Sequence, residues 1–235
     1  MATTSERRLV FLDAAVLAAP VTRSLILISQ GHVAARYLAR WSLKVEAEAE
    51  SALESRAKGK TRNTTTLSTL RERFDWGKDV LVRDAPAVAV ATEDTDPKDR
   101  HVIAAAAGSR IRIIVTPNVS DFGHSDLRRF GISVVHPDLF LAQEMTPAMY
   151  RATLEEWSAS RSSPPNTPPA MHEALGRTFP RLTAAMTSEY PSVTPKVPHD
   201  LPVEVFRGVC CLVCGRILTD PTSLSLGVGQ ECRKR

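Results

Sequence analysis

The chain has little of three features that would each indicate a particular class of protein. Its 235 residues contain no apolar run of about 18 residues, the length that a membrane-spanning helix requires. Aromatic residues make up only 6% of the sequence, which argues against broad stacking platforms for single-stranded bases. No cysteine occurs before Cys210, whereas a disulfide-stabilised secreted fold would have cysteines spread along the chain. These absences favour a cytoplasmic protein without a membrane segment.

The N-terminus imitates a secretory signal, because Arg7 and Arg8 precede an apolar stretch that reaches Ala19. Asp13 lies in the middle of that stretch, and the apolar region of a signal peptide should carry no charge there. We therefore interpret residues 8–12 as a buried first strand that ends at an acid. The formal net charge of +4 and the pI of about 9.0 permit a polyanionic partner but do not require one.

Short apolar runs alternate with helical patterns along most of the chain. Strand-length runs lie at 8–12, 87–91, 111–115 and 132–135, and helical patterns lie at 14–28, 42–53, 67–81, 125–130, 146–158 and 171–186. Strands that alternate with helices predict an α/β fold with a parallel sheet. Proline-rich stretches after 158 and after 190 read as extended linkers. We therefore expect an α/β domain at 1–145, a helical extension at 146–198 and a cysteine-rich module at 199–235.

Single residues indicate where some of these helices begin or end. Pro20 should kink or delay the first helix, and Ser42 is a plausible N-cap of the second. Gly131 is typical of the residue that follows the C-terminus of a helix.

Acidic and amide side chains lie at the ends of several predicted elements. Asp13 follows the first strand, and Asp99 lies in the first turn of a helix. That helix leads to the strand at 111–115, which is followed by Asn118 and Asp121. Sites in open parallel sheets form outside the C-terminal ends of the strands. Mg²⁺ prefers oxygen ligands, and two such ions can hold the attacking water and the leaving oxygen of a phosphodiester. The pattern predicts a divalent-cation site.

Ordinary structural roles would also explain most of these acids. Asp96 is followed by proline, which is typical of a helix N-cap, and Asp99 would then be an acid favoured by the helix dipole. Asp121 would stabilise a turn, and Glu48 would belong to a solvated helix face. Asp13 is harder to explain in this way, because a charge that ends an apolar strand is normally paired or functional.

A family resemblance is carried by five segments, in this order: F-L-D-A-A-V-L, A-P-V-T-R-S-L-I-L, R-W-S-L-K-V-E-A-E, D-P-K-D-R-H-V-I-A-A-A and I-I-V-T-P-N-V-S-D-F. In this order and spacing they closely resemble a PIN domain, in particular the VapC-like toxin ribonucleases of bacterial toxin–antitoxin systems. The segment G-I-S-V-V-H-P-D-L-F-L is similar to the strand and helix that close such a domain. The resemblance covers about residues 9–141 and continues more weakly to about residue 186.

The resemblance implies a PIN-like parallel sheet and an endoribonuclease that depends on Mg²⁺ or Mn²⁺. The implied catalytic residues are Asp13, Glu48, Asp99, Asn118 and Asp121, with Asp13 and Asp99 as metal ligands and with Thr116 and Arg23 as substrate-binding residues. Glu46 is an alternative to Glu48 as the second acid. Pro117 stands where many relatives have an aromatic residue or arginine. The implied partners are RNA and a cognate antitoxin, and homodimers are common in relatives.

A basic loop at 58–66 carries Lys58, Lys60 and Arg62. These side chains would bind RNA phosphates if the loop lies beside the acids. A solvated loop without such a role explains the same sequence equally well.

The cysteines suggest a second metal site. Cys211-x-x-Cys214 followed by glycine is typical of a zinc knuckle, and Cys232 follows at a spacing found in zinc sites. The fourth ligand is open between Cys210, which is adjacent to Cys211, and His199. This part resembles a small uncharacterised zinc-ribbon-like domain with the pattern C-x-x-C-G-R-x-L-T-D-P-x-S and a closing G-x-G-x-x-C. Structural Zn²⁺ would stabilise a segment with few apolar residues, whereas a disordered cysteine-bearing tail is the alternative.

Two other functions compete with the nuclease. A catalytically silent PIN-like protein would bind nucleic acid or protein without a metal ion. A phospho-acceptor domain with Asp13 as nucleophile would need an acid pair before Asp13 and a lysine near Val115, and the chain has neither, since Arg7 and Arg8 precede the first strand.

Overall fold

The computed structural model describes residues 7–57, 67, 80–85, 92–198, 200 and 204–234. The basic loop with Lys58, Lys60 and Arg62 lies outside the described residues. The strand expected at 87–91, most of the helix expected at 67–81 and His199 lie outside them as well.

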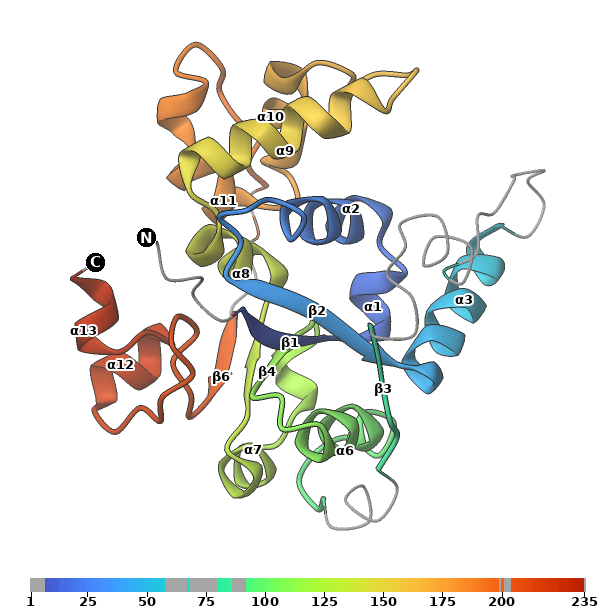
Figure 1. Cartoon of the computed structure of the whole chain (residues 1–235), viewed down its shortest axis with the longest axis vertical. Coiled ribbons are helices and arrows are strands. Elements are labelled where there is room, and N and C mark those ends of the chain that lie inside the picture. Colours follow the sequence, from blue (N-terminus) through green and yellow to red (C-terminus); the bar gives the residue numbers. More distant parts are fainter. Residues whose placement is uncertain are drawn as a thin grey trace.

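A mostly parallel sheet forms the centre of the molecule (Figure 1). Over the described residues its strand order is β3-β2-β1-β4-β5-β6. The strands are β1 (Arg8–Leu12), β2 (Tyr37–Ser42), β3 (Leu81–Val82), β4 (Ile113–Val115), β5 (Ser133–Val135) and β6 (Phe206–Gly208). Neighbouring strands are parallel except for β6, which is antiparallel to β5. The α/β prediction is confirmed, although β2, β3 and β6 were not among the expected strands, and Leu81 lies in β3 where the end of a helix was expected.

The two central strands explain where a site can form. Val10, Phe11 and Leu12 of β1 are buried, as is every residue of β4, which is the continuous apolar pattern of interior parallel strands. β1 pairs with β2 on one side and with β4 on the other. The connection after β1 leads to one side of it, and the connection that reaches β4 leads to the other side. A crevice is therefore expected beyond the C-terminal ends of β1 and β4.

Helices cover both faces of the sheet. They are α1 (Ala14–Leu17), α2 (Pro20–Ser29), α3 (Leu43–Ala57), α6 (Arg100–Gly108), α7 (His124–Phe130) and α8 (Pro137–Glu144). In Figure 1, α6 and α7 lie on one side of the sheet, and α2 and α8 lie on the other.

The helix ends predicted from Pro20, Ser42 and Gly131 are confirmed, whereas the N-cap of α6 is Asp99 and not Asp96. The first helical stretch is divided, because α2 begins at Pro20. The Ser42 hydroxyl accepts a hydrogen bond from the Val45 backbone N–H at 3.3 Å, which is an N-cap. Gly131 ends α7 with φ of 63°, a left-handed conformation that glycine adopts at little cost.

A helical extension follows the sheet domain. It contains α9 (Pro147–Ala159), α10 (Pro168–Leu175), α11 (Pro180–Ala185) and the short helix η3 (Thr187–Glu189). The single helix expected at 171–186 is two helices, because proline at 180 starts a new one. α9 packs on α2 and α11 packs on α8, so the extension covers the outer side of these helices.

The C-terminal segment joins the same sheet through β6 and continues with α12 (Pro221–Leu226) and α13 (Gln230–Arg233). The Arg8 guanidinium at the start of β1 donates to the Val213 carbonyl and pairs with Glu144. The division into three parts remains a prediction. In the part of the chain that the structure describes, no helix has the length and apolar character needed to cross a membrane.

Candidate functional site

Asp13 lies at the C-terminal end of β1, where it caps α1, and its side chain is only 4% exposed. Its Oδ1 accepts from the Ala14 backbone N–H at 2.7 Å, and its Oδ2 accepts from the Thr116 hydroxyl at 2.7 Å. The Thr116 hydroxyl in turn accepts from the Asn118 backbone N–H at 3.1 Å. Burial raises the pKa of Asp13, and the Thr116 hydrogen bond opposes that rise. The carboxylate is therefore oriented by β4 as well as by its own helix.

Asp99 lies at the N-cap position of α6 but makes no capping hydrogen bond with its side chain. Burial raises its pKa to about 7, and the negative charges of Asp13, Asp121, Asp96 and Glu48 add to this rise. A carboxyl group feels such repulsion only from acids that lie near it. Asp13, Asp121 and Glu48 thus lie near enough to Asp99 to affect its pKa, and we call these four acids the acid cluster below.

The two candidate glutamates on α3 have different surroundings. Glu46 is 5% exposed, and its Oε2 accepts from the Trp41 indole N–H at 2.7 Å. Glu48 is half-buried, and its Oε2 lies 3.1 Å from His101 Nε2 at the start of α6. Glu48 therefore faces Asp99, whereas Glu46 is held by Trp41.

Arg23 on α2 lies at the other end of the short helix α1. It donates a hydrogen bond to the Leu17 carbonyl, and burial lowers the pKa of its guanidinium. This contact connects α1 with α2. Its expected contact with substrate stays a prediction.

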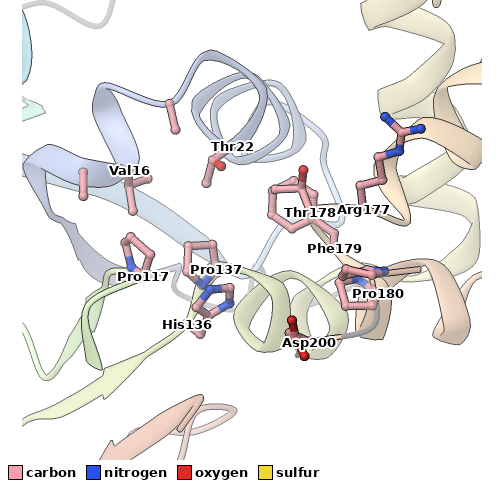
Figure 2. A pocket seen from close by; sticks show the side chains of 13 residues that line it. Val16, Thr22, Pro117, His136, Pro137, Arg177, Thr178, Phe179, Pro180 and Asp200 are labelled. Atoms are coloured by element: carbon pink, nitrogen blue, oxygen red, sulfur yellow. The ribbon is translucent and has the colours of Figure 1, made fainter. Parts of the chain in front are cut away.

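A cavity of about 440 Å³ opens between the region of α1 and α2 and the start of α11 (Figure 2). It begins at Val16 and Pro117, which are close in sequence to Asp13 and Thr116, and it extends to Arg177 at its far end. Its walls are largely apolar and include four prolines: Pro117, Pro137, Pro180 and Pro198. His136 contributes a polar group, and burial lowers the pKa of its imidazole. The cavity thus has room for a small molecule.

Cys211, Cys214 and Cys232 form the second candidate site. Their sulfur atoms all lie within 4.8 Å of one another. Among the described residues, these three side chains are the group close enough together to hold one metal ion. A tetrahedral zinc site with Zn–S bonds of about 2.3 Å would have sulfur atoms about 3.8 Å apart, so the three thiols fit such a site. Burial, and then the neighbouring thiols, raise the pKa of Cys232 to about 12.

Cys210 does not join these three cysteines. Its Sγ donates to the Gly131 carbonyl at 3.0 Å, and its backbone N–H donates to the Ser133 hydroxyl at 2.6 Å. Adjacent residues of an extended backbone point in opposite directions. Cys210 therefore anchors the segment to β5 while Cys211 faces the other thiols.

The chain is 30% identical over 141 residues to a Mycobacterium tuberculosis protein named as the ribonuclease VapC50. The match spans 57% of the chain and 76% of that protein. The chain belongs to the VapC family of PIN-domain proteins. The resemblance found in the sequence is thus confirmed, while no solved structure matches the chain significantly.

The C-terminal segment of this VapC-family protein matches a different family. Residues 202–235 match a family of unknown function, DUF6011. All the cysteines of the chain lie within this match.

The sequence did not indicate the role of Asp126, which holds the backbone of residues 93–95 in this VapC-family protein. Its carboxylate is 2% exposed and accepts from the backbone N–H groups of Glu93, Asp94 and Thr95 at 2.8–3.0 Å. Burial alone would raise the pKa of Asp126, but these hydrogen bonds outweigh it and lower the pKa. An acid in the first turn of α7 carries no sequence signal beyond a favourable helix dipole.

The two loops that carry acids are also bonded to each other. The Asp96 backbone N–H donates to the Asp121 carbonyl at 2.9 Å, and the Gly123 N–H donates to the Thr95 hydroxyl at 3.0 Å. A Cβ at Gly123 would lie 2.4 Å from the side chain of Asp94, so the loops approach too closely for any larger residue. The relative positions of Asp99 and Asp121 are therefore fixed by backbone contacts.

Proposed function

We propose that this VapC-family protein is an endoribonuclease that requires Mg²⁺ or Mn²⁺ and serves as the toxin of a toxin–antitoxin pair. The observation that supports this most directly is the proximity of Asp13, Glu48 and Asp121 to Asp99, because the four acids come from four separate parts of the chain. The relative from M. tuberculosis is named as a ribonuclease, which agrees with the proposal.

The acid cluster offers the oxygen ligands that a hard divalent cation prefers. Burial raises the pKa of Asp99 to about 7, and the negative charges of the neighbouring acids add to this rise, so a bound cation would be favoured there. Asp13 and Asp99 would hold the ion, with Asp121 and the Asn118 amide beside them. When bound, such an ion polarises a phosphodiester and lowers the pKa of a bound water.

The residues of the chain itself would orient this chemistry. Thr116 holds one oxygen of Asp13 and leaves the carboxylate in one orientation. His101 lies 3.1 Å from Glu48 and would keep that side chain directed at the cluster. The largely apolar cavity beginning at Pro117 would receive a nucleotide next to the cleaved bond, and Arg177 would contact a phosphate.

The proposed partners follow from this activity. A nuclease of this kind needs restraint, so we propose a cognate antitoxin that covers the acid cluster, with RNA as substrate. Homodimers and a cytoplasmic location remain predictions. The three clustered cysteines would bind one structural Zn²⁺.

The test is cleavage of total RNA by the purified full chain in the presence of Mg²⁺, with Asp99→Asn as the inactive variant. We expect the substitution to reduce the cleavage rate at least about a hundredfold, because a metal ligand supplies several kcal/mol to the transition state. Glu93→Gln is the matched control, since Glu93 is an exposed acid in the adjoining loop. Equal cleavage by wild type and Asp99→Asn would refute the proposal, and binding of RNA without cleavage or metal would favour a silent binding module.

A further inference from the structure

The C-terminal segment supplies an edge strand to the sheet that carries the acid cluster. β6 pairs with β5, with Arg207 opposite Val134 and Gly208 opposite Ser133. Gly208 has φ of +144°, and a Cβ there would lie 2.4 Å from the Ser133 Cα. Only glycine permits this approach. The segment is therefore held in a defined register beside β5.

The Arg207 side chain extends from β6 to η2 (Val119–Asp121), the short helix that carries one of the clustered acids. Its Nη1 donates to the Ser120 carbonyl at 3.1 Å and to the Phe122 carbonyl at 2.7 Å. These carbonyls belong to the residues on either side of Asp121. Arg207 thus holds the backbone that directs Asp121.

Glu204 fixes the orientation of the same guanidinium. Arg207 Nε donates to Glu204 Oε1 at 2.8 Å, and Nη2 donates to Oε2 at 2.5 Å. This is a two-point pair between a planar fork and a carboxylate, which has strict geometry. Because one edge of the guanidinium is held by Glu204, its remaining nitrogen is directed at the two carbonyls.

A loop that bears a clustered acid needs such a brace. The loops before Asp99 and around Asp121 are bonded to each other, since the Asp96 backbone N–H donates to the Asp121 carbonyl at 2.9 Å, so two negative side chains are held near each other and repel. η2 has only three residues and few internal hydrogen bonds to resist that repulsion. The contact with Arg207 adds both hydrogen bonds and a positive charge on the far side of the loop.

We propose that Arg207 is a positioning residue for the acid cluster, and that the C-terminal segment of unknown function thereby sets how tightly the cluster binds its divalent cation. The inference rests on the proposed nuclease function, and it gives the segment a part in that function. Arg207 would act on the cluster through Asp121, without contact with RNA.

The experiment compares the full chain with Arg207→Ala and measures both RNA cleavage and binding of Mn²⁺. Mn²⁺ prefers oxygen ligands and is detected directly by electron paramagnetic resonance. We expect the Mg²⁺ concentration for half-maximal cleavage and the Kd for Mn²⁺ to rise about tenfold, as is usual when a group that orients a ligand is lost. The KM for RNA should stay unchanged. The amount of Mn²⁺ that still binds to Asp99→Asn measures binding elsewhere on the chain.

Arg112→Ala is the matched control. Arg112 also donates to the C-terminal segment, at the Gly215 carbonyl, but it lies before β4, at the end of the strand opposite to the acid cluster. Loss of this contact should leave the metal dependence unchanged. If Arg207→Ala does not fold, Arg207→Lys replaces it, because lysine keeps the charge but cannot bond Glu204 and both carbonyls together.

The outcomes separate this inference from the function on which it rests. Unchanged metal dependence in folded Arg207→Ala or Arg207→Lys would overturn the positioning role, as would an equal change in Arg112→Ala. A lower melting temperature with an unchanged Kd for Mn²⁺ would show a purely structural role and also overturn it. A wild type that binds Mn²⁺ at the acid cluster but never cleaves RNA would instead refute the nuclease function.

Discussion

Thr116 and Asp13 are 103 positions apart in the sequence, yet the Thr116 hydroxyl donates to Asp13 Oδ2 at 2.7 Å. Both residues follow central parallel strands, so the topology of the sheet brings them together. Thr116 is fully buried, and its hydroxyl also accepts from the Asn118 N–H. One hydroxyl therefore connects the acid after β1 with the loop after β4.

Replacement of Thr116 by valine should impair catalysis more than folding. Thr116→Val keeps the shape but removes the donor, which leaves the buried Asp13 carboxylate free to rotate. We expect cleavage to fall about ten- to a hundredfold, as for other groups that orient metal ligands. The free energy of unfolding should fall by only about 1 kcal/mol. The measurements are RNA cleavage rates and urea unfolding, and Thr116→Ser, which keeps the hydroxyl, should restore cleavage. Full activity in the valine variant would contradict this role.

The pKa of Asp99 makes the stability of the metal-free protein depend on pH. Its folded-state pKa of about 7 exceeds the ordinary value of 3.8, so the folded state binds more protons between these values and stability falls as pH rises through them. Asp99→Asn removes the ionisable group. In the absence of divalent cations we expect the variant to melt at a higher temperature than wild type at about pH 8. The difference should shrink as the pH is lowered towards 4.

Thermal melting at several pH values in a chelating buffer checks this expectation. Glu93→Gln provides the comparison, because it also replaces an acid by its amide, at an exposed position of the adjoining loop. Added Mg²⁺ should stabilise wild type and leave Asp99→Asn unaffected, since binding to the folded state alone raises stability. A variant that is less stable than wild type at every pH would show that Asp99 has a structural role instead.

The sequence was sufficient to predict the central strands of the sheet. β1, β4 and β5 are apolar runs of strand length, and they form where the sequence places them. β2 was missed although the sequence carries a strand signal there. Buried Tyr37, Ala39 and Trp41 alternate with the less buried Leu38 and Arg40, which is the period of a strand.

Other features could not be read from the sequence because they depend on tertiary contacts. β6 is only three residues long, and its strand conformation comes from pairing with β5. Asp126 and Arg207 act on backbone N–H and carbonyl groups, and no residue pattern records which backbone groups a folded loop will present. Cys210 and Cys211 likewise look equivalent as ligands until the backbone directs them apart.

Glu46 and Glu48 should respond differently to substitution. Glu48→Gln removes a charge from the acid cluster, so we expect cleavage to fall at least about tenfold with little change in stability. Glu46→Ala removes the acceptor of the buried Trp41 indole N–H, which should cost about 1–3 kcal/mol of unfolding free energy. Glu46→Gln should retain both activity and stability, because an amide oxygen can accept the same hydrogen bond. Cleavage assays and denaturant unfolding distinguish the two, and loss of activity in Glu46→Gln with full activity in Glu48→Gln would reverse the assignment.

Zinc content provides a test of the cysteine site that needs no activity assay. We expect about one Zn²⁺ per chain in the wild type by elemental analysis, and almost none in Cys211→Ser, because a serine hydroxyl is a poor zinc ligand. Cys210→Ser is the adjacent control and should retain the zinc, since the Cys210 thiol is directed at the Gly131 carbonyl. Because metal binding stabilises the fold around it, a strong chelator should make the segment after residue 204 sensitive to proteolysis before the sheet unfolds. Equal zinc content in all three proteins would mean that Cys211 is not a ligand, and loss of zinc in Cys210→Ser alone would place the site elsewhere.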